Sequence, residues 1–189
     1  MKIAFVGSHC VGKTTAVWHV GSALKQIGYE SVEILPELAR LCPLPINEEA
    51  GFSTTLWLMM EQIKTEYFMQ QKKSHGKEII ILSDRSVFDN YAYGSINCPP
   101  MKDFLKTIAE AWMKVAPYDA LLYFPIEWKI IDDGTRSTNQ WWQMKVDNTL
   151  WAWLVSHHAD KFVHVSGKTH TERCQNALEI VEKLLEGKK

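Results

Sequence analysis

The segment that most constrains this chain is residues 7–14, GSHCVGKT, close to its N-terminus. It fits the pattern G-x-x-x-x-G-K-[ST], in which the backbone N–H groups of a glycine-containing loop surround phosphate groups. Residues 2–6 form an apolar run that predicts a buried parallel strand before the loop. Apolar residues at helical spacing predict a helix after the loop, which ends at Gly28. Because strand, loop and helix come in the order that the motif requires, we expect this segment to bind a nucleoside triphosphate.

The residue types in this loop predict distinct roles. Gly7 and Gly12 permit backbone conformations that are closed to other residues, so that successive N–H groups can turn toward an anion. We expect Lys13 to reach the β- and γ-phosphates and the Thr14 hydroxyl to ligate Mg²⁺. The alternative is a glycine-rich turn that matches the pattern by chance, and the flanking strand and helix argue against it. The other residues expected to line the nucleotide are His9, Cys10, Val11 and Thr15.

Length and charge limit the classes of function. The 189 residues suit a single domain, residues 1–189, and carry a net charge of −1 without a long basic run. Duplex nucleic acid is therefore not expected as a partner, because neutralising several phosphates needs clustered Lys and Arg. No apolar run approaches the ~20 residues that span a bilayer. The first strand begins at Lys2 and leaves no room for a targeting segment, so we expect a cytoplasmic protein without a membrane partner.

Alternating strand and helix patterns along the rest of the chain predict an α/β fold, with a mostly parallel sheet and helices on both faces. A helix is expected to begin at the cap residue Asn47 and to end near Gly76. Later helices are expected after Pro99-Pro100, over the Trp-rich segment from residue 141, and after the capping-box pattern at residues 169–172. The later strands are expected at residues 31–35, 78–85, 119–124 and 162–165.

The helix expected after Asn47 has an apolar stripe at helical spacing. We expect this stripe to face the core, with the two methionines as packing residues rather than parts of a cofactor site. Its members are Phe52, Leu56, Met59, Met60, Ile63 and Tyr67.

Polar side chains follow the predicted strands at the edge where open α/β sheets bind ligands. Asp84 ends an apolar strand, where it can hold Mg²⁺, orient the attacking group, or simply cap the next turn. Glu37 suits a general base that takes a proton from a hydroxyl, or an acid in the first turn of a helix. Arg85 is placed to bind an anionic group. Arg40 follows Glu37 by one helical turn and either pairs with it or binds substrate.

Arginine is rare in this chain, and planar, bidentate phosphate recognition is a task that Arg performs and Lys performs poorly. We predict that Arg136, in a polar loop, is a lid arginine that stabilises the transferring phosphoryl group. Lys168 and Thr169 follow the fifth strand and are expected near the nucleotide. Arg173 is expected either against the nucleotide base or in solvent. The four arginines, each in or beside a candidate site segment, are Arg40, Arg85, Arg136 and Arg173.

These segments resemble P-loop nucleoside and nucleotide kinases, and especially the ribosylnicotinamide-kinase-like AAA-domain proteins. The resemblance implies a three-layer α/β/α P-loop NTPase with a five-stranded parallel sheet and ATP·Mg²⁺ as the phosphoryl donor. It also implies a mobile lid around Arg136, over residues 126–145, and an acceptor pocket near Glu37, Arg40, Arg85 and Asp89. The matching segments are residues 7–15, 36–40, 83–85 with Asp89 and Tyr93, 132–136, and 167–173.

The predicted function is an ATP- and Mg²⁺-dependent phosphotransferase that moves the γ-phosphoryl group to a nucleoside or a nucleotide. Lys13, Glu37, Asp84 and Arg136 are its predicted catalytic residues. A hydroxyl acceptor needs a base such as Glu37, whereas a phosphate acceptor mainly needs arginines, so the scarcity of Arg favours a nucleoside. One alternative is an ATPase or GTPase switch that acts through a protein partner, and another is phosphorylation of a polynucleotide 5′-hydroxyl. The eight tryptophans leave open an exposed interface, such as that of a homodimer.

Overall fold

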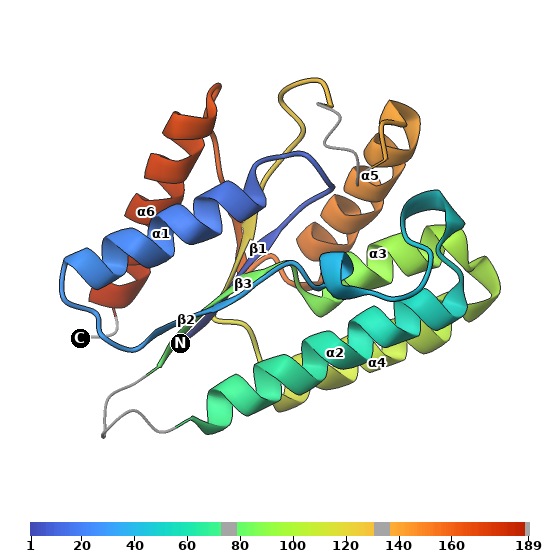
Figure 1. Ribbon diagram of the computed structural model, residues 1–189, viewed down its shortest axis with the longest axis horizontal. Helices are drawn as coiled ribbons and strands as arrows, with labels where there is room; N and C mark the ends of the chain where they lie inside the picture. The colour runs from blue at the N-terminus through green and yellow to red at the C-terminus, as the bar shows by residue number, and fades with distance from the viewer. Residues whose placement is uncertain (73–78, 131–136, 188–189) are drawn as a thin grey trace.

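Short apolar runs form a parallel sheet at the centre of the protein (Figure 1). The computed structural model describes residues 1–72, 79–130 and 137–187. The strand order is β2-β3-β1-β4-β5 and every neighbouring pair is parallel, which confirms the predicted five-stranded α/β architecture. The strands are β1 (Lys2–Val6), β2 (Val32–Leu35), β3 (Ile80–Asp84), β4 (Ala120–Tyr123) and β5 (Phe162–His164).

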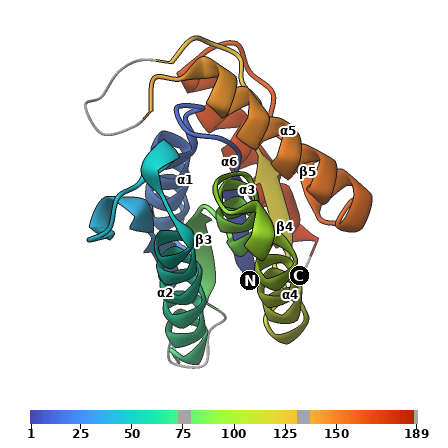
Figure 2. The same cartoon turned by 90° about the vertical axis from the view of Figure 1, so that its right-hand side faces the viewer.

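Helices cover both faces of the sheet and complete the predicted three layers (Figure 1, Figure 2). α1 and α6 pack on one face, and α2, α3, α4 and α5 pack on the other. Within the part of the chain that the structure describes, no helix is both long and apolar enough to cross a membrane. The helices are α1 (Lys13–Gln26), α2 (Phe52–Gln71), α3 (Val87–Asn97), α4 (Lys102–Val115), α5 (Gln140–His157) and α6 (His170–Glu186), with 3-10 turns η1 (Leu38–Leu41), η2 (Asn47–Glu49) and η3 (Pro99–Met101).

The central strand β1 divides the core into two hydrophobic clusters. Ile3 and Phe5 pack with α1 and α6, because successive side chains of a strand point to opposite faces. Ala4 and Val6 pack with the helices of the other layer. All four side chains are fully buried, as expected for a parallel strand that is covered on both sides.

Three strand ends lie side by side at the carboxyl edge of the sheet. Phe5 of β1 is in register with Asp84 of β3, and Val6 is in register with Tyr123 of β4. The loop that follows β1 therefore begins between Asp84 on one side and Tyr123 on the other.

The predicted start and end of the second helix were wrong. Asn47 lies in the 3-10 turn η2 with φ +61°, and α2 begins at Phe52 with Gly51 as its N-cap residue. The helix ends at Gln71, because Lys72 leaves the helical conformation with ψ 123°. Two acids after Asn47 are typical of a first helical turn, and here they belong to a separate turn that precedes the helix.

The predicted core face of α2 was also wrong in part. Met59 is fully buried, but Met60 and Tyr67 are 40% and 49% exposed. The predicted stripe is only partly buried because polar side chains occupy most of the buried positions of α2, where Gln62 and Glu66 bond to each other. The buried residues of α2 are Thr54, Thr55, Met59, Gln62 and Glu66.

The helix α3 was missing from the sequence prediction. Its start carries a capping box, in which the Ser86 hydroxyl accepts hydrogen bonds from the N–H groups of Phe88 and Asp89. The Asp89 carboxylate in turn accepts from the Ser86 N–H at 2.8 Å. The spacing Ser-x-x-Asp before an apolar run was the available signal for this helix.

Candidate active site

The phosphate loop has a backbone path that only glycine permits at two positions. Gly7 has φ +145°, and a Cβ there would lie 2.6 Å from the Phe124 carbonyl oxygen. Gly12 has φ +89°, and a Cβ there would lie 3.1 Å from Nδ1 of His170. The loop therefore combines the left-handed conformations and close contacts that let its N–H groups surround an anion.

Lys13 lies folded against this loop and is 5% exposed. Its Nζ donates to the Ser8 carbonyl oxygen at 2.5 Å. Burial lowers the pKa of Lys13 to about 8. The positive charge of Arg85 lowers this pKa as well, whereas the nearby carboxylates raise it. A buried ammonium group of this kind gains stabilisation when an anion binds beside it.

Asp84 and Thr14 meet beside the loop. The Thr14 hydroxyl donates to Oδ2 of Asp84 at 2.5 Å. Among the described residues, Oδ1 of Asp84 is buried and has no hydrogen-bond partner, and burial raises the pKa of this carboxyl group. A carboxylate oxygen and a hydroxyl are hard oxygen ligands, so these two residues fit Mg²⁺.

Arg173 supports the loop from the β5 side. It is 1% exposed, so the alternative of a solvated side chain is wrong. Its Nη1 donates to the carbonyl oxygens of Val11 and Pro125 at 3.0 and 2.8 Å, and its Nε donates to that of Gly167 at 3.1 Å. Among the described residues, Nη2 has no hydrogen-bond partner and lies 3.6 Å from Oε1 of Glu127. Contact with a nucleotide base stays a prediction for Arg173.

Trp128 and His170 lie over the outer side of the loop and were not singled out in the sequence. Trp128 Nε1 donates to the Cys10 carbonyl oxygen at 3.0 Å, and its ring centroid lies 4.2 Å from that of His170. The Arg173 guanidinium lies 4.4 Å from the same indole ring. We call Trp128, His170 and Arg173, with the loop that they contact, the donor side of the site.

Lys168 and Thr169 form hydrogen bonds at the N-terminus of α6, where Thr169 is the N-cap residue. The Thr169 hydroxyl accepts from the Glu172 N–H at 3.1 Å, and the Glu172 carboxylate accepts from the N–H groups of Thr169 and Lys168 at 3.3 and 2.7 Å. This is the predicted capping box. Binding of the nucleotide by these two residues stays a prediction.

Glu37 lies on the other side of the loop, in the wall of a pocket. It is 7% exposed. Arg85 donates to Oε1 of Glu37 from both Nε and Nη2, at 3.0 and 2.6 Å. Nε of Arg40 lies 3.4 Å from the second carboxylate oxygen, so the predicted pairing of Arg40 with Glu37 is present.

Asp89 links the start of α3 to the phosphate loop. Its Oδ1 accepts from the Gly7 N–H at 3.0 Å, and its Oδ2 accepts from the Ser86 hydroxyl at 2.7 Å. Burial raises the pKa of Asp89, and these hydrogen bonds oppose the shift. Both carboxylate oxygens are thus engaged by the protein itself, and a direct substrate contact stays a prediction.

Tyr93 and His9 connect the pocket to the phosphate loop. The Tyr93 hydroxyl lies 3.1 Å from Nδ1 of His9, and the Arg85 guanidinium lies 4.9 Å from the Tyr93 ring centroid. On a predicted helix over residues 87–97, Asp89 and Tyr93 would have shared a face at i, i+4 spacing, which was the signal for this role.

The pocket is lined mainly by uncharged polar and apolar side chains. We call it the acceptor pocket, and together with α2 and α3 the acceptor side of the site. It contains three of the four residues that were predicted to bind the acceptor, Glu37, Arg40 and Arg85, whereas the fourth, Asp89, is not in its lining. Of the predicted lid, residues 131–136, which include Arg136, lie outside the described residues. The lining residues are His9, Glu37, Leu38, Ala39, Arg40, Ile46, Asn47, Ala50, Thr54, Thr55, Leu58, Gln62, Arg85, Asn90, Tyr93 and Asn97.

The fold is similar to those of known proteins. Two crystal structures of the NadR protein, in complex with NAD and AMP-PNP and in complex with NR, each have a TM-score of 0.72 and 15% sequence identity. Both matches cover 97% of this chain. They cover 49% and 50% of the two NadR chains, so this chain spans about half the length of NadR. Thymidylate kinase from Ehrlichia chaffeensis has a TM-score of 0.64 and 16% identity, over 97% of this chain and 98% of that one.

These similarities establish the fold, which is that of P-loop kinases. No curated protein matches the sequence. The sequence does match the AAA domain family over residues 2–173, which is most of its length. The chain therefore belongs to the AAA domain family.

Proposed function

We propose that this protein is a P-loop kinase that transfers the γ-phosphoryl group of ATP to a hydroxyl group of a nucleoside-like small molecule. The observation that supports this proposal best is the position of Glu37. Its carboxylate lies in the wall of the acceptor pocket, which His9 of the phosphate loop also lines. A base and a phosphate cradle on two sides of one site are the parts that phosphoryl transfer to a hydroxyl requires.

On the donor side, the loop N–H groups and Lys13 would hold the triphosphate. Thr14 and Asp84 would hold Mg²⁺, which supplies charge neutralisation on the phosphates when it is bound. Arg136 would add a positive charge beside the transferring group, as its place in the sequence suggests.

On the acceptor side, Glu37 would accept the proton of the attacking hydroxyl, and Arg85 would orient this carboxylate. The pairing of both pocket arginines favours an unphosphorylated acceptor. Arg40 and Arg85 both pair with Glu37, so neither guanidinium is reserved for a phosphate on the acceptor. The amide side chain of Asn90, which lines the pocket, suits a neutral polar heterocycle or a sugar.

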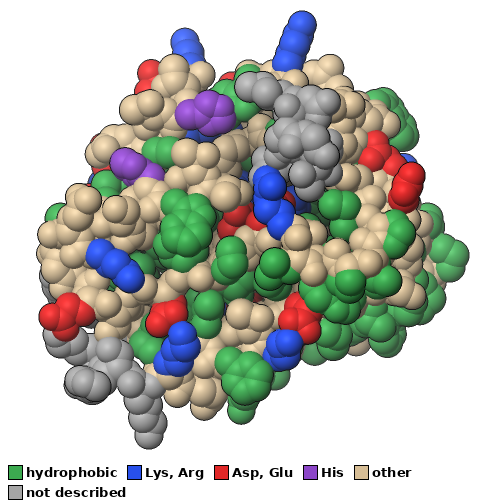
Figure 3. Space-filling model, in the orientation of Figure 1, with side chains coloured by type: hydrophobic (Ala, Val, Ile, Leu, Met, Phe, Trp, Pro, Cys, Tyr) green, Lys and Arg blue, Asp and Glu red, His purple; other side chains and the backbone are tan. Residues whose placement is uncertain are grey.

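A small-molecule acceptor is also favoured over a polynucleotide. Lys and Arg side chains lie singly on the face drawn in Figure 3 and form no basic stripe among the residues described there. The similar structures point the same way, because NadR was crystallised with NR and with AMP-PNP, and the other relative is a thymidylate kinase.

The test is an assay with γ-labelled ATP, Mg²⁺ and pooled nucleosides, nucleoside monophosphates and nicotinamide riboside. We expect a labelled monophosphate that is lost in Glu37→Gln, while ATP binding is retained. Glu33→Gln is the matched control, because Glu33 lies on β2, the strand that precedes Glu37, and pairs with Lys72 at the surface. It should leave the product unchanged.

Other outcomes would replace the proposal. A labelled diphosphate that survives Glu37→Gln would identify a nucleotide kinase. Release of free phosphate without any labelled acceptor would favour the switch that acts through a protein partner.

A further inference from the structure

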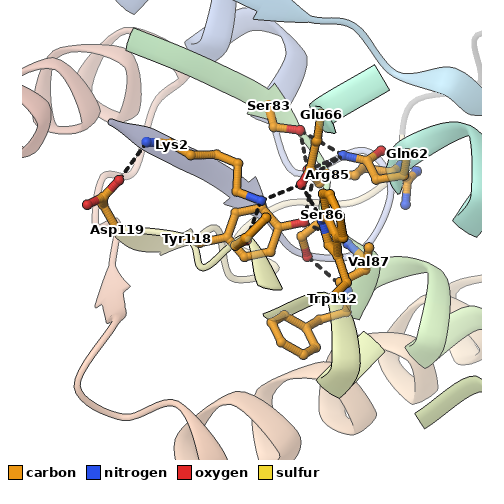
Figure 4. Close-up of polar contacts among 12 residues, drawn as sticks. Lys2, Gln62, Glu66, Ser83, Arg85, Ser86, Val87, Trp112, Tyr118 and Asp119 are labelled. Atoms are coloured by element: carbon orange, nitrogen blue, oxygen red, sulfur yellow. Dashed lines mark hydrogen bonds and ion pairs between the residues drawn. The ribbon is translucent and has the colours of Figure 1, made fainter. Parts of the chain in front are cut away.

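A buried polar network lies between α2, α4 and the sheet, next to the acceptor pocket (Figure 4). At its centre is the carboxylate of Glu66, which is fully buried. Lys2 Nζ and Trp112 Nε1 donate to its Oε2 at 2.5 and 2.7 Å. Gln62 Nε2 and the Tyr118 hydroxyl donate to its Oε1, each at 2.7 Å. Each carboxylate oxygen thus accepts two hydrogen bonds, as a buried charge requires.

One arm of the network leads from Glu66 to the turn between β3 and α3. The Gln62 amide donates to the Ser83 hydroxyl at 2.8 Å as well as to Glu66. The Ser83 hydroxyl then donates to the carbonyl oxygen of Arg85 at 2.8 Å. Gln62 is therefore the side chain through which the buried carboxylate reaches the backbone of Arg85.

A second arm holds the other end of the same turn. The Tyr118 hydroxyl, which donates to Glu66, accepts from the N–H group of Val87 at 3.1 Å. Val87 is the first residue of α3. The carbonyl of Arg85 and the N–H of Val87 are both connected to one carboxylate, so the turn is fixed at two points.

The backbone of Arg85 needs such support. Its φ is +87°, a conformation that residues other than glycine rarely adopt. Its N–H continues the sheet by donating to the Phe5 carbonyl oxygen at 3.0 Å, so the reversal takes place at Arg85 itself. This reversal lets the guanidinium reach Glu37, to which it donates at 2.6 Å.

We propose that Gln62 is a positioning residue for phosphoryl transfer, because it fixes the carbonyl of Arg85 and so holds the guanidinium of Arg85 against Glu37. Gln62 also lines the acceptor pocket, so it lies between the bound acceptor and the buried network. An apolar residue would fill a helix face without the cost of desolvating an amide, so packing alone does not explain a glutamine here. The expected effect of Gln62 on phosphoryl transfer rests on the proposed function, whereas its expected effect on the contact between Arg85 and Glu37 does not.

The first experiment needs no substrate. The chain has four arginines, so the Nε–H signals in a ¹H–¹⁵N spectrum are few, and Arg85→Met assigns the one from Arg85. In Gln62→Met, which keeps the length of the side chain and removes its donors, we expect the Arg85 Nε–H to exchange with solvent about tenfold faster. The Arg173 Nε–H, bonded to Gly167, is the internal reference and should not change.

Trp112→Phe is the matched control. It removes a donor to the same carboxylate, but from the oxygen that does not face the turn. Faster exchange at Arg85 in folded Gln62→Met and not in Trp112→Phe supports the proposal. Unchanged exchange in Gln62→Met, or an equal change in both variants, overturns it. If Gln62→Met does not fold, Ser83→Ala tests the same arm, because it removes the hydroxyl that donates to the Arg85 carbonyl.

The second experiment measures transfer to the acceptor. In Gln62→Met we expect kcat/KM for the acceptor to fall about tenfold, with the Kd for ATP unchanged. Because Gln62 acts through Arg85, the same substitution should have no further effect in an Arg85→Met background. An equal loss in both backgrounds overturns the positioning role. If the protein transfers no phosphoryl group at all, the proposed function fails and the exchange result still decides the role of Gln62 in holding Arg85.

Discussion

The donor side and the acceptor side of the phosphate loop are held by different kinds of contact. On the donor side, Arg173 and Trp128 donate to backbone carbonyl groups, including those of Val11 and Cys10 in the loop itself. On the acceptor side, side chains bond to other side chains: Arg85 pairs with Glu37, and Gln62 pairs with Glu66.

This difference has a functional consequence. A site whose ligand contacts are backbone N–H groups binds any ligand with the right phosphates, because every residue of the loop offers the same donor. A pocket built from paired side chains depends on each partner, and it can therefore discriminate between similar small molecules. We expect substitutions on the donor side to affect all triphosphates, and those on the acceptor side to affect the acceptor alone.

The largest effect is expected from Lys13, the charged side chain of the phosphate loop on the donor side. Lys13→Met removes the cation that would hold the β- and γ-phosphates, so phosphoryl transfer should fall on the order of 10²–10³-fold. The loss should be the same for every acceptor, as measured by initial rates with two acceptors. A loss that depended on the acceptor would break the division between the two sides.

Arg173→Met should produce the largest loss of stability. It leaves the carbonyl oxygens of Val11, Pro125 and Gly167 without the guanidinium, so the free energy of unfolding in urea should fall by about 3 kcal/mol. The half-exposed Arg40 is the matched control, and Arg40→Met should cost about 0.5 kcal/mol or less. Similar losses for the two variants would contradict the supporting role of Arg173.

Tyr93→Phe should affect the acceptor side alone. It removes the hydroxyl that lies 3.1 Å from His9, and kcat/KM for the acceptor should fall about tenfold at an unchanged Kd for ATP. Tyr91→Phe is the control on the same helix, because Tyr91 is buried outside the acceptor pocket. A weaker affinity for ATP in Tyr93→Phe would show that the pocket and the loop are not separable.

The smallest effect is a pH dependence on the donor side. The pKa of Lys13 is lowered to about 8, so the free protein loses this charge as the pH rises through that value. Affinity for tripolyphosphate should fall about fourfold between pH 7 and pH 8.5, as measured by calorimetry. Without ligand the sign is opposite: above pH 8 the unfolded state binds more protons than the folded state, so the free energy of unfolding should rise. Lys13→Arg stays charged, and a pH dependence that persisted there would assign the effect to another group.

The donor side of the site could be predicted from the sequence more completely than the acceptor side. The phosphate loop was recognisable because its function depends on residues that are consecutive in the chain, and the five strands were recognisable from their apolar runs. The acceptor side was predicted only in part. The charged residues after the strands were identified, but the helix over residues 87–97 was not, so Tyr93 had no assigned place.

The sequence by itself determined the α/β class, the parallel strands and the position of the phosphate loop, because each depends on a local pattern of apolar residues and glycines. Only the tertiary structure decided which face of α2 is buried and that Gln62, Glu66 and Arg85 meet. The physical reason is that a buried polar side chain is stable only beside its hydrogen-bond partners. For Glu66 these partners come from β1, α4 and the segment before β4 as well as from α2, and no local pattern in the sequence records that they meet.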